Sequence, residues 1–125
     1  MVYLGNVYKD LGDYEKAKTL LTQSLKHYQQ SLPAEHVYGA WALASLGSVL
    51  KRLGKYEEAE SYFIKTLEIY EKTYGVDHIE IARILTEIGE NSLVKGSLEK
   101  ASSHLQQALN IFIQRNHPEK YIPLE

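Results

Sequence analysis

Gly54-Lys55-Tyr56-Glu57-Glu58-Ala59 is the stretch that decides the fold, because a close copy stands 42 residues before it and another stands 42 residues after it. The copies are Gly12-Asp13-Tyr14-Glu15-Lys16-Ala17 and Gly96-Ser97-Leu98-Glu99-Lys100-Ala101. A second motif keeps the same period without a gap, as Leu4-Gly5-Asn6-Val7, Leu46-Gly47-Ser48-Val49 and Ile88-Gly89-Glu90-Asn91. A fixed period of this length is typical of stacked structural repeats, so the sequence predicts a solenoid.

The composition limits the class of protein. The 125 residues have room for one domain, and a net charge of −2 gives no basic stripe of the kind that binds nucleic acid. No apolar run approaches the roughly 20 residues that cross a bilayer, and the first residues lack the pattern of a signal peptide. The absence of cysteine excludes disulfides and fits a reducing compartment. We therefore expect a cytoplasmic protein that binds neither nucleic acid nor membranes.

The apolar pattern predicts two helices in each repeat. In the second repeat, apolar residues recur at three- and four-residue steps over about 36–53, which is the spacing of one helical face. The second helix of that repeat begins near Tyr56. The same pattern predicts helices over about 14–31, 77–94 and 98–115, with Asp77 as an N-cap.

Glycines recur at two kinds of position. Three follow the predicted first helices, where a left-handed C-terminal cap is needed: Gly12, Gly54 and Gly96. Three others lie inside the first helices, where glycine costs about 1 kcal/mol relative to alanine: Gly5, Gly47 and Gly89. We expect each of these to face an alanine of the second helix, so that the pair crosses closely; the alanines are Ala17, Ala59 and Ala101.

The period divides the chain into one domain over 1–125. Repeat one covers about 1–34 and lacks the first turns of its first helix, repeat two covers about 35–76, and repeat three covers about 77–116. Residues 117–125 look like the start of a further first helix, with Pro118 in its first turn. This pattern indicates either a segment of a longer array or a short protein whose end faces need neighbours.

These residues resemble the tetratricopeptide repeat. Eight residues of the second repeat stand at the signature spacings of that family: Leu43, Leu46, Gly47, Leu50, Gly54, Tyr56, Ala59 and Phe63. The longer unit, with 42 residues in place of the usual 34, is similar to the repeats of kinesin light chains. The resemblance implies an all-α, right-handed superhelical solenoid of antiparallel helix pairs, with about three repeats. It also implies a concave groove that is lined by the first helices.

The expected groove residues are those first-helix positions that the register leaves free of packing within a pair. They are Asn6, Lys9, Trp41, Ser45, Ser48, Lys51, Arg52, Arg83, Glu87 and Glu90. Trp41 is the only tryptophan, and it either anchors a ligand in the groove or packs on the preceding second helix. The cations either hold a carboxylate or lie as scattered solvated charges opposite Glu87 and Glu90.

A carboxylate clamp is one specific use of such grooves. Some members of the family hold the C-terminal carboxylate of heat-shock chaperones with lysines, asparagines and an arginine. Asn6 and Arg83 match clamp positions, but three others do not: Val2, Ser45 and Glu87 stand where lysine, asparagine and arginine belong. This departure argues against that use.

The sequence carries no sign of catalytic, cofactor or metal chemistry. His36 and His78 are one repeat apart and lack the spacing of metal ligands, so we interpret them as packing or capping residues at helix starts. Glu57 and Glu58 are adjacent on a helix and point in different directions, which does not suit paired acid–base work. We therefore expect a protein that is not an enzyme.

The functional hypothesis is a scaffold for protein–protein interaction, which binds an extended or helical peptide segment in the concave groove. The alternative is an assembly or regulatory module of a larger protein that self-associates through its stacking faces. In that case, a homo-oligomer forms through the apolar faces at the two ends.

Overall fold

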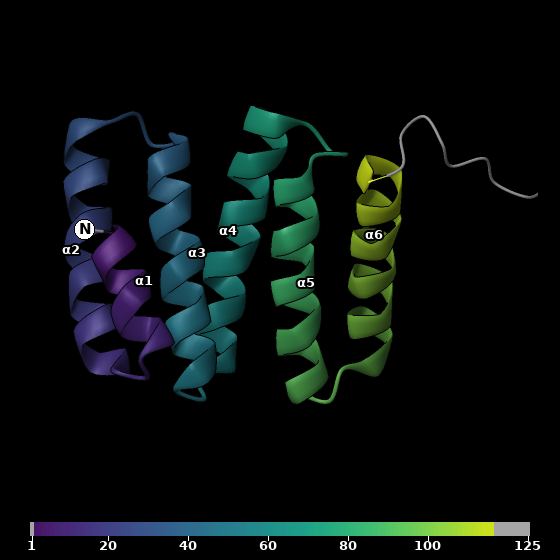
Figure 1. Ribbon diagram of the computed structural model, residues 1–125, viewed down its shortest axis with the longest axis horizontal. Coiled ribbons are helices and arrows are strands. Elements are labelled where there is room, and N and C mark those ends of the chain that lie inside the picture. The colour runs from purple at the N-terminus through teal and green to yellow at the C-terminus, as the bar shows by residue number, and fades with distance from the viewer. Residues whose placement is uncertain (1, 117–125) are drawn as a thin grey trace, which may run out of the picture.

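The computed structural model describes residues 2–116, and over that range the protein forms six α-helices and no strand. The helices are α1 (Val2–Asp10), α2 (Tyr14–Ser31), α3 (Val37–Arg52), α4 (Tyr56–Tyr74), α5 (Ile79–Val94) and α6 (Leu98–Asn116) (Figure 1). The expected all-α fold with two helices per repeat is confirmed. Met1 and the partial helix expected over 117–125 lie outside the described residues.

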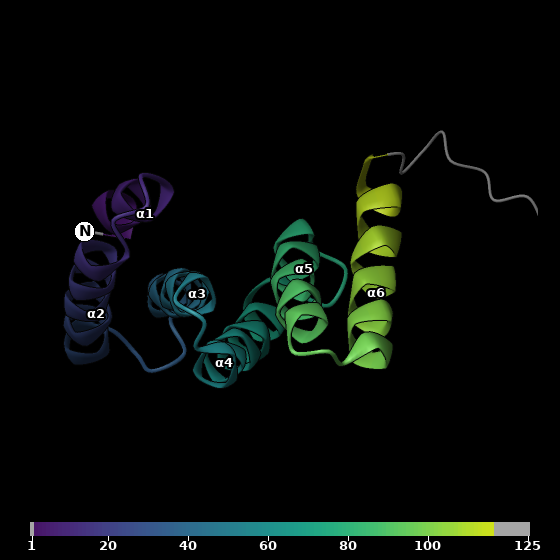
Figure 2. The same cartoon turned by 90° about the horizontal axis from the view of Figure 1, so that it is seen from below.

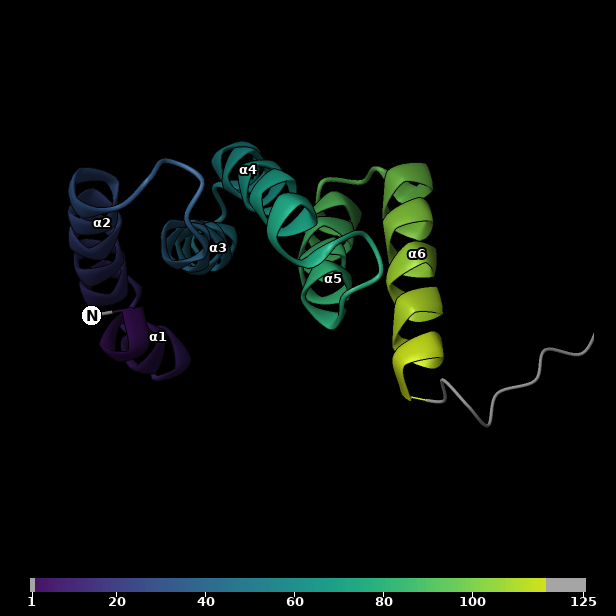
Figure 3. The ribbon, with the colours of Figure 1, turned by 90° about the horizontal axis from the view of Figure 1, so that it is seen from above.

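The helices form three antiparallel pairs that follow one another in a single row (Figure 1). Each helix contacts the next along the sequence, and the first helices α1, α3 and α5 also contact one another in order. The second helices α2, α4 and α6 make no such contact with one another among the described residues. Figures 2 and 3 show that the first helix is displaced toward the same side of its partner in the first two pairs, α1 from α2 and α3 from α4. The row therefore curves with the first helices on its inner side.

The mid-helix glycines allow each pair to cross closely, and the side chains nearest to them are large ones rather than those of the expected alanines. A Cβ added to Gly47 would lie 2.6 Å from the ring of Phe63, which is completely buried. Added Cβ atoms on Gly5 and Gly89 would lie 2.7 Å from Leu21 and Leu105. The atoms nearest to an added Cβ on Gly47 belong to Phe63, which lies one helical turn after the expected Ala59 on the same helix face. At Gly89 the carbonyl oxygen of the expected Ala101 also lies within 3.4 Å of the added atom. The missing side chain makes room for a large one.

We expect Gly47→Ala to lower the free energy of unfolding by about 1–3 kcal/mol, because the new methyl group overpacks against Phe63. Gly47→Leu should cost more. Gly39→Ala is the matched control on the same helix, since a Cβ at Gly39 meets no atom within 4 Å. That change should raise the unfolding free energy by up to about 1 kcal/mol through helix propensity. Urea denaturation followed by circular dichroism measures both, and equal effects of the two alanines would contradict the close crossing.

The turns inside each repeat follow the glycine prediction. Gly54 adopts φ of +81° directly after α3, a left-handed conformation that only glycine takes up without strain. The backbone N–H of Lys55 then donates to the carbonyl of Leu50 and closes the end of the helix. Gly12 and Gly96 have the same role, with φ of +85° and +87°.

Histidines cap the two complete first helices. The backbone N–H of Tyr38 donates to Nδ1 of His36 at 3.1 Å, and that of Glu80 donates to Nδ1 of His78 at the same distance. The interpretation of these histidines as capping residues is confirmed. Asp77 is not the N-cap that the sequence predicted, because α5 begins at Ile79 and the residue before that is the histidine. The nearer acceptor side chain satisfies the free N–H group of the first turn.

We expect His36→Ala to cost about 1 kcal/mol of stability, because the first turn of α3 loses its acceptor. His36→Asn should retain most of the stability, because asparagine is among the best N-cap residues. Thermal and urea unfolding of the two variants provide the measurement. If asparagine is as damaging as alanine, the imidazole acts through its packing rather than through the cap.

The junction between the first and second repeats is apolar. Val49 is completely buried in a cluster with Ala17 and Leu21 of α2, and Leu53 packs at its edge. Tyr14 contributes to the same cluster from the start of α2. The hydrophobic effect therefore holds α3 on α2.

The junction between the second and third repeats is polar at the same positions. Asn91 stands where Val49 does, is completely buried, and donates through Nδ2 to the carbonyl oxygen of Tyr56 at 3.0 Å. Lys95 pairs with Glu57 at 2.9 Å and with Glu60 at 3.0 Å. These two carboxylates raise the pKa of the Lys95 ammonium above its ordinary value. The two junctions therefore differ in chemistry at these positions, although α4 and α5 also share a large apolar cluster that includes Phe63, Ile84 and Ile88.

Candidate functional site

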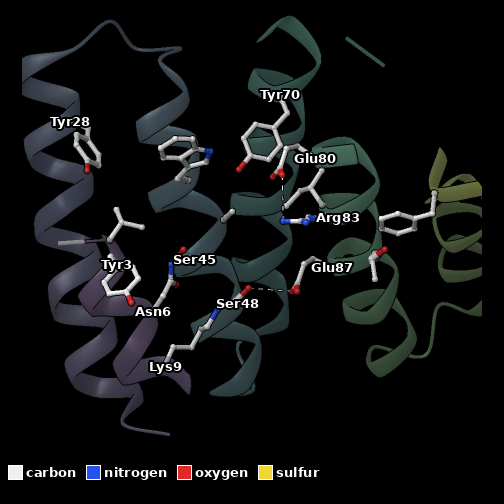
Figure 4. A pocket seen from close by; sticks show the side chains of 16 residues that line it. Tyr3, Asn6, Lys9, Tyr28, Ser45, Ser48, Tyr70, Glu80, Arg83 and Glu87 are labelled. Atoms are coloured by element: carbon white, nitrogen blue, oxygen red, sulfur yellow. Dashed lines mark hydrogen bonds and ion pairs between the residues drawn. The ribbon is translucent and has the colours of Figure 1, made fainter. Parts of the chain in front are cut away.

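A hollow of about 830 Å³ lies on the inner side of the curved row, and we call it the groove (Figure 4). It is open to solvent and is lined from all three first helices. Seven of the ten predicted groove residues line it: Asn6, Lys9, Trp41, Ser45, Ser48, Arg83 and Glu87. The register therefore predicted seven of the sixteen residues that line the groove.

Lys51, Arg52 and Glu90 do not line the groove. The Lys51 ammonium lies 2.9 Å from the Glu87 carboxylate and 3.6 Å from that of Glu90, and only 13% of its side chain is exposed. Glu87 also accepts a hydrogen bond from the Ser48 hydroxyl at 3.3 Å. Lys51 is thus already paired with two carboxylates of α5. It is not available to hold a ligand carboxylate, which was one of the two roles that the sequence left open.

Three groove residues that sequence reasoning missed are the aromatic side chains of second helices. Tyr28, Tyr70 and Phe112 occupy the same position of the 42-residue register and all line the groove. Their recurrence with the 42-residue period can be seen in the sequence, but a recurring aromatic residue is also what core packing produces. Tyr70 is indeed buried, with 4% of its surface exposed, and burial followed by the nearby Glu80 raises the pKa of its hydroxyl. The phenol therefore stays neutral and keeps its hydroxyl proton.

Other groove residues outside the prediction come mostly from first helices. α1 contributes Val2 and Tyr3, and Tyr3 is 83% exposed. The rest of the lining is made up of Ala44, Glu80, Ile84 and Thr86. The register also places Ala44 and Thr86 on the concave side, whereas Val2, Tyr3, Glu80 and Ile84 were not predicted.

Trp41 lines the groove with 39% of its surface exposed. Its ring lies 4.9 Å from that of Tyr38, which in turn lies 5.8 Å from Tyr28 of α2 and 4.7 Å from His36. Trp41 is therefore supported by an aromatic cluster and at the same time faces the groove. Its link to the preceding second helix runs through Tyr38.

The first turns of α3 and α5 have the same local construction with different side chains. In each helix a histidine is the N-cap, and the backbone N–H of the residue two positions after it donates to the histidine ring. The side chain of that residue then contacts the side chain three positions further along. In α3 the contacting pair is Tyr38 and Trp41. In α5 it is Glu80 and Arg83, whose charged groups lie 3.5 Å apart. An aromatic subsite and an ionic subsite thus stand one repeat apart in the groove.

The cations in the groove differ in how far they are compensated. The Arg83 side chain is 68% exposed, and its only salt bridge among the described residues is the one to Glu80. Lys9 has no ion pair within that part of the protein. The nearby Asn6 has a buried Oδ1 that accepts no hydrogen bond from residues 2–116. Arg83 and Lys9 are therefore the cations that can bond an incoming acceptor.

The remaining chemistry of the described residues is limited. Over residues 2–116, no group of three or more histidine, aspartate or glutamate side chains is placed to hold a metal ion. None of the described helices is both long and apolar enough to cross a membrane.

We expect Lys51→Met to lower the free energy of unfolding by about 1 kcal/mol, because Glu87 and Glu90 lose their shared counter-ion. Lys9→Met is the matched control, since Lys9 holds the same register position in repeat one without an ion pair in the described range. Denaturation followed by Trp41 fluorescence compares the two variants. A similar change in both would show that the ion pair between α3 and α5 contributes nothing measurable.

A family model described as tetratricopeptide repeat matches residues 1–63 and 40–114, which together cover most of the sequence. No curated protein matches the sequence. Among solved structures, the TPR domain of Arabidopsis FLU is 26% identical with a TM-score of 0.79, and the match covers 90% of this chain and 92% of that one.

Two further solved structures are similar in fold. One, from Podosopora anserina, is named for the nearly identical TPR-like repeats of a kinesin light chain; it is 21% identical with a TM-score of 0.82, and the match covers 95% of this chain. The other is BtubC (BKLC) from P. vanneervenii, 18% identical with a TM-score of 0.56 over 98% of this chain. The sequence spans 58% and 64% of the lengths of these two proteins.

Proposed function

Because the protein belongs to the tetratricopeptide repeat family, whose members generally mediate protein–protein interactions, we propose that its groove binds an extended or helical segment of a partner protein. Proteins of this family are generally not enzymes, and binding here needs no covalent step. The partner segment would fit a preformed surface through shape and a few polar contacts. The proposal rests on one observation above all: the aromatic subsite at Trp41 and the ionic subsite at Arg83 share one open groove.

The size and composition of the groove support this proposal. Its volume of about 830 Å³ lies in the range of ligand sites, which combine apolar walls with a few polar groups. Trp41 offers a large, partly exposed ring of the type that dominates binding energy at interfaces. Its support by Tyr38 reduces the rotamer entropy that a ligand would otherwise have to restrict.

The charges suggest the chemistry of the ligand. Arg83 can form bidentate bonds to a carboxylate or to main-chain carbonyls, and its bond to Glu80 is an exposed pair of small energy. Lys9 adds a second cation at the other end of the groove, on α1. An acidic segment, or the C-terminal carboxylate of a partner polypeptide, is therefore the favoured ligand. Glu87 favours a segment that turns basic at one end, although Lys51 already compensates part of its charge.

A displayed library of random peptides tests the groove directly. Peptides selected on the 125-residue protein should change the fluorescence of Trp41, which is the only tryptophan. Trp41→Ala and Arg83→Glu should each weaken their binding by about ten-fold or more, because each removes one anchor. Lys26→Glu is the control, since it makes the same reversal of charge on the exposed surface of α2 outside the groove.

Calorimetric titration with the selected peptides gives the affinities. Binding should also weaken as salt rises, because exposed charge contacts are screened. Unchanged affinity in both Trp41→Ala and Arg83→Glu would show that the peptides bind elsewhere on the protein. Circular dichroism of each variant checks that the helices remain intact.

The second candidate function is assembly through the stacking faces. The observation in its favour is the apolar side of α1, where Leu4 is 46% exposed, and the adjoining Leu11, which is 73% exposed. Contiguous exposed apolar surface of this kind is typical of interaction sites.

A further inference from the structure

The exposed side of α1 carries residues that the other repeats bury. Leu4 and Val7 are 46% and 36% exposed, whereas Leu46 and Val49 at the same positions of α3 are 3% and 0% exposed. The difference arises because α3 packs on α2, and no second helix precedes α1 among the described residues. We call this surface the α1 face, and it consists of Tyr3, Leu4, Val7 and Leu11.

The opposite end of the row presents the matching surface. Leu98 and Leu109 of α6 are 67% and 50% exposed, and Leu93 at the end of α5 is 50% exposed. The residues at the positions of Leu98 and Leu109 in α2 are Tyr14 and Leu25, and both pack against the cluster that joins α2 to α3. We call this surface the α6 face, and it consists of Leu93, Leu98, Leu105 and Leu109.

We propose that the α6 face of one copy docks on the α1 face of a second copy, and that the 42-residue register continues across the two molecules. This docking rests on the second candidate function, and apart from Tyr3 its residues differ from those that line the groove. If the period continues, each residue of the second copy stands three periods after its own position in the first copy, which is 126 residues further along. Each contact can therefore be read from an equivalent contact within one molecule.

The register brings apolar side chains together at every equivalent contact. Leu98 meets Val7 of the second copy as Tyr14 meets Val49 in the α2–α3 cluster. Leu105 and Leu109 meet Leu4 as Leu21 and Leu25 meet Leu46. Within one molecule Lys51 pairs with Glu87. The equivalent positions across the proposed contact are Leu93 of the first copy and Tyr3 of the second copy, so both charged residues are replaced by apolar ones. This joint change favours a second copy as the occupant.

The polar contacts between α4 and α5 show which kind of second helix would not fit the α1 face. At α4–α5, Asn91 and Lys95 need the carbonyl of Tyr56 and the carboxylates of Glu57 and Glu60. The α1 face has Val7 and Leu11 at the positions of Asn91 and Lys95, with no donor to offer. On α6, Ser102 stands at the position of Glu60. Of the two carboxylates that pair with Lys95, the less exposed one therefore has no counterpart on α6. Both sides of the proposed contact therefore favour the apolar version of the junction.

Such a contact joins two different surfaces, so it is heterologous and leaves a free face at each end of the pair. The two single variants Val7→Glu and Leu98→Glu should therefore behave in a characteristic way. Each removes one face and should lower the association constant about ten- to hundred-fold. Mixed in equal amounts, they should form a one-to-one complex, because the first keeps its α6 face and the second keeps its α1 face.

Sedimentation velocity of the 125-residue protein over a range of concentrations provides the measurement. The unmodified protein should increase in mean mass with concentration, and Ile64→Glu should associate equally well, because Ile64 is 45% exposed on α4 outside both faces. Leu11→Glu is a second α1-face variant at a more exposed position, and it guards against a Val7→Glu variant that fails to fold. Trp41→Ala and Arg83→Glu should leave association unchanged, which separates this docking from the groove.

Two outcomes would overturn the proposal. One is an unmodified protein that stays monomeric at all concentrations. The other is a mixture of the two face variants that forms no complex while the unmodified protein associates, which would indicate that like faces meet. Circular dichroism of each variant ensures that only folded molecules are compared.

Discussion

The close crossing of first and second helix at each glycine is the constraint on which the rest of the structure depends. Phe63 occupies the space that a side chain at Gly47 would fill, and Leu21 and Leu105 do the same in the other pairs. Because one contact recurs three times, the three pairs have similar geometry and can stack with regular curvature. A bulky residue at any of these glycines would push a pair apart and disturb its neighbours as well.

The same closeness determines what the groove contains. One aromatic side chain from each second helix reaches the inner side, although the first helices form most of that surface. Tyr70 therefore serves both the core and the groove wall, and its buried hydroxyl stays protonated. The groove also has its own internal ion pairs, so the number of charged side chains on its walls overstates what a ligand can bind. Glu87 shows this most clearly, since the Lys51 ammonium lies 2.9 Å from its carboxylate and already compensates its charge.

The sequence predicted those features that depend on one repeat at a time. The helix pairs, the left-handed glycines and seven of the sixteen groove residues follow from a period and a helical face. The features that it missed depend on how two helices are rotated against each other. The register placed Ala59 opposite Gly47, but it did not show that Phe63, one helical turn further along, fills the space beside that glycine. The pairing of Lys51 with Glu87 likewise joins neighbouring repeats at 2.9 Å. An aromatic residue that recurs with the period indicates burial, but it does not tell which edge of the ring remains accessible.

The histidine caps separate the backbone of the groove from its chemistry. His36 and His78 fix the first turn of their helices in the same way, whatever side chains stand two and five residues later. One turn displays tyrosine and tryptophan, and the other displays glutamate and arginine, on an equivalent main chain. Exchanging those two side chains would therefore transplant a recognition property from one repeat to its neighbour without altering the scaffold beneath. Binding specificity in such an array can therefore change through substitution of only two residues in a repeat. The order of the subsites along the row can then evolve without a change of fold.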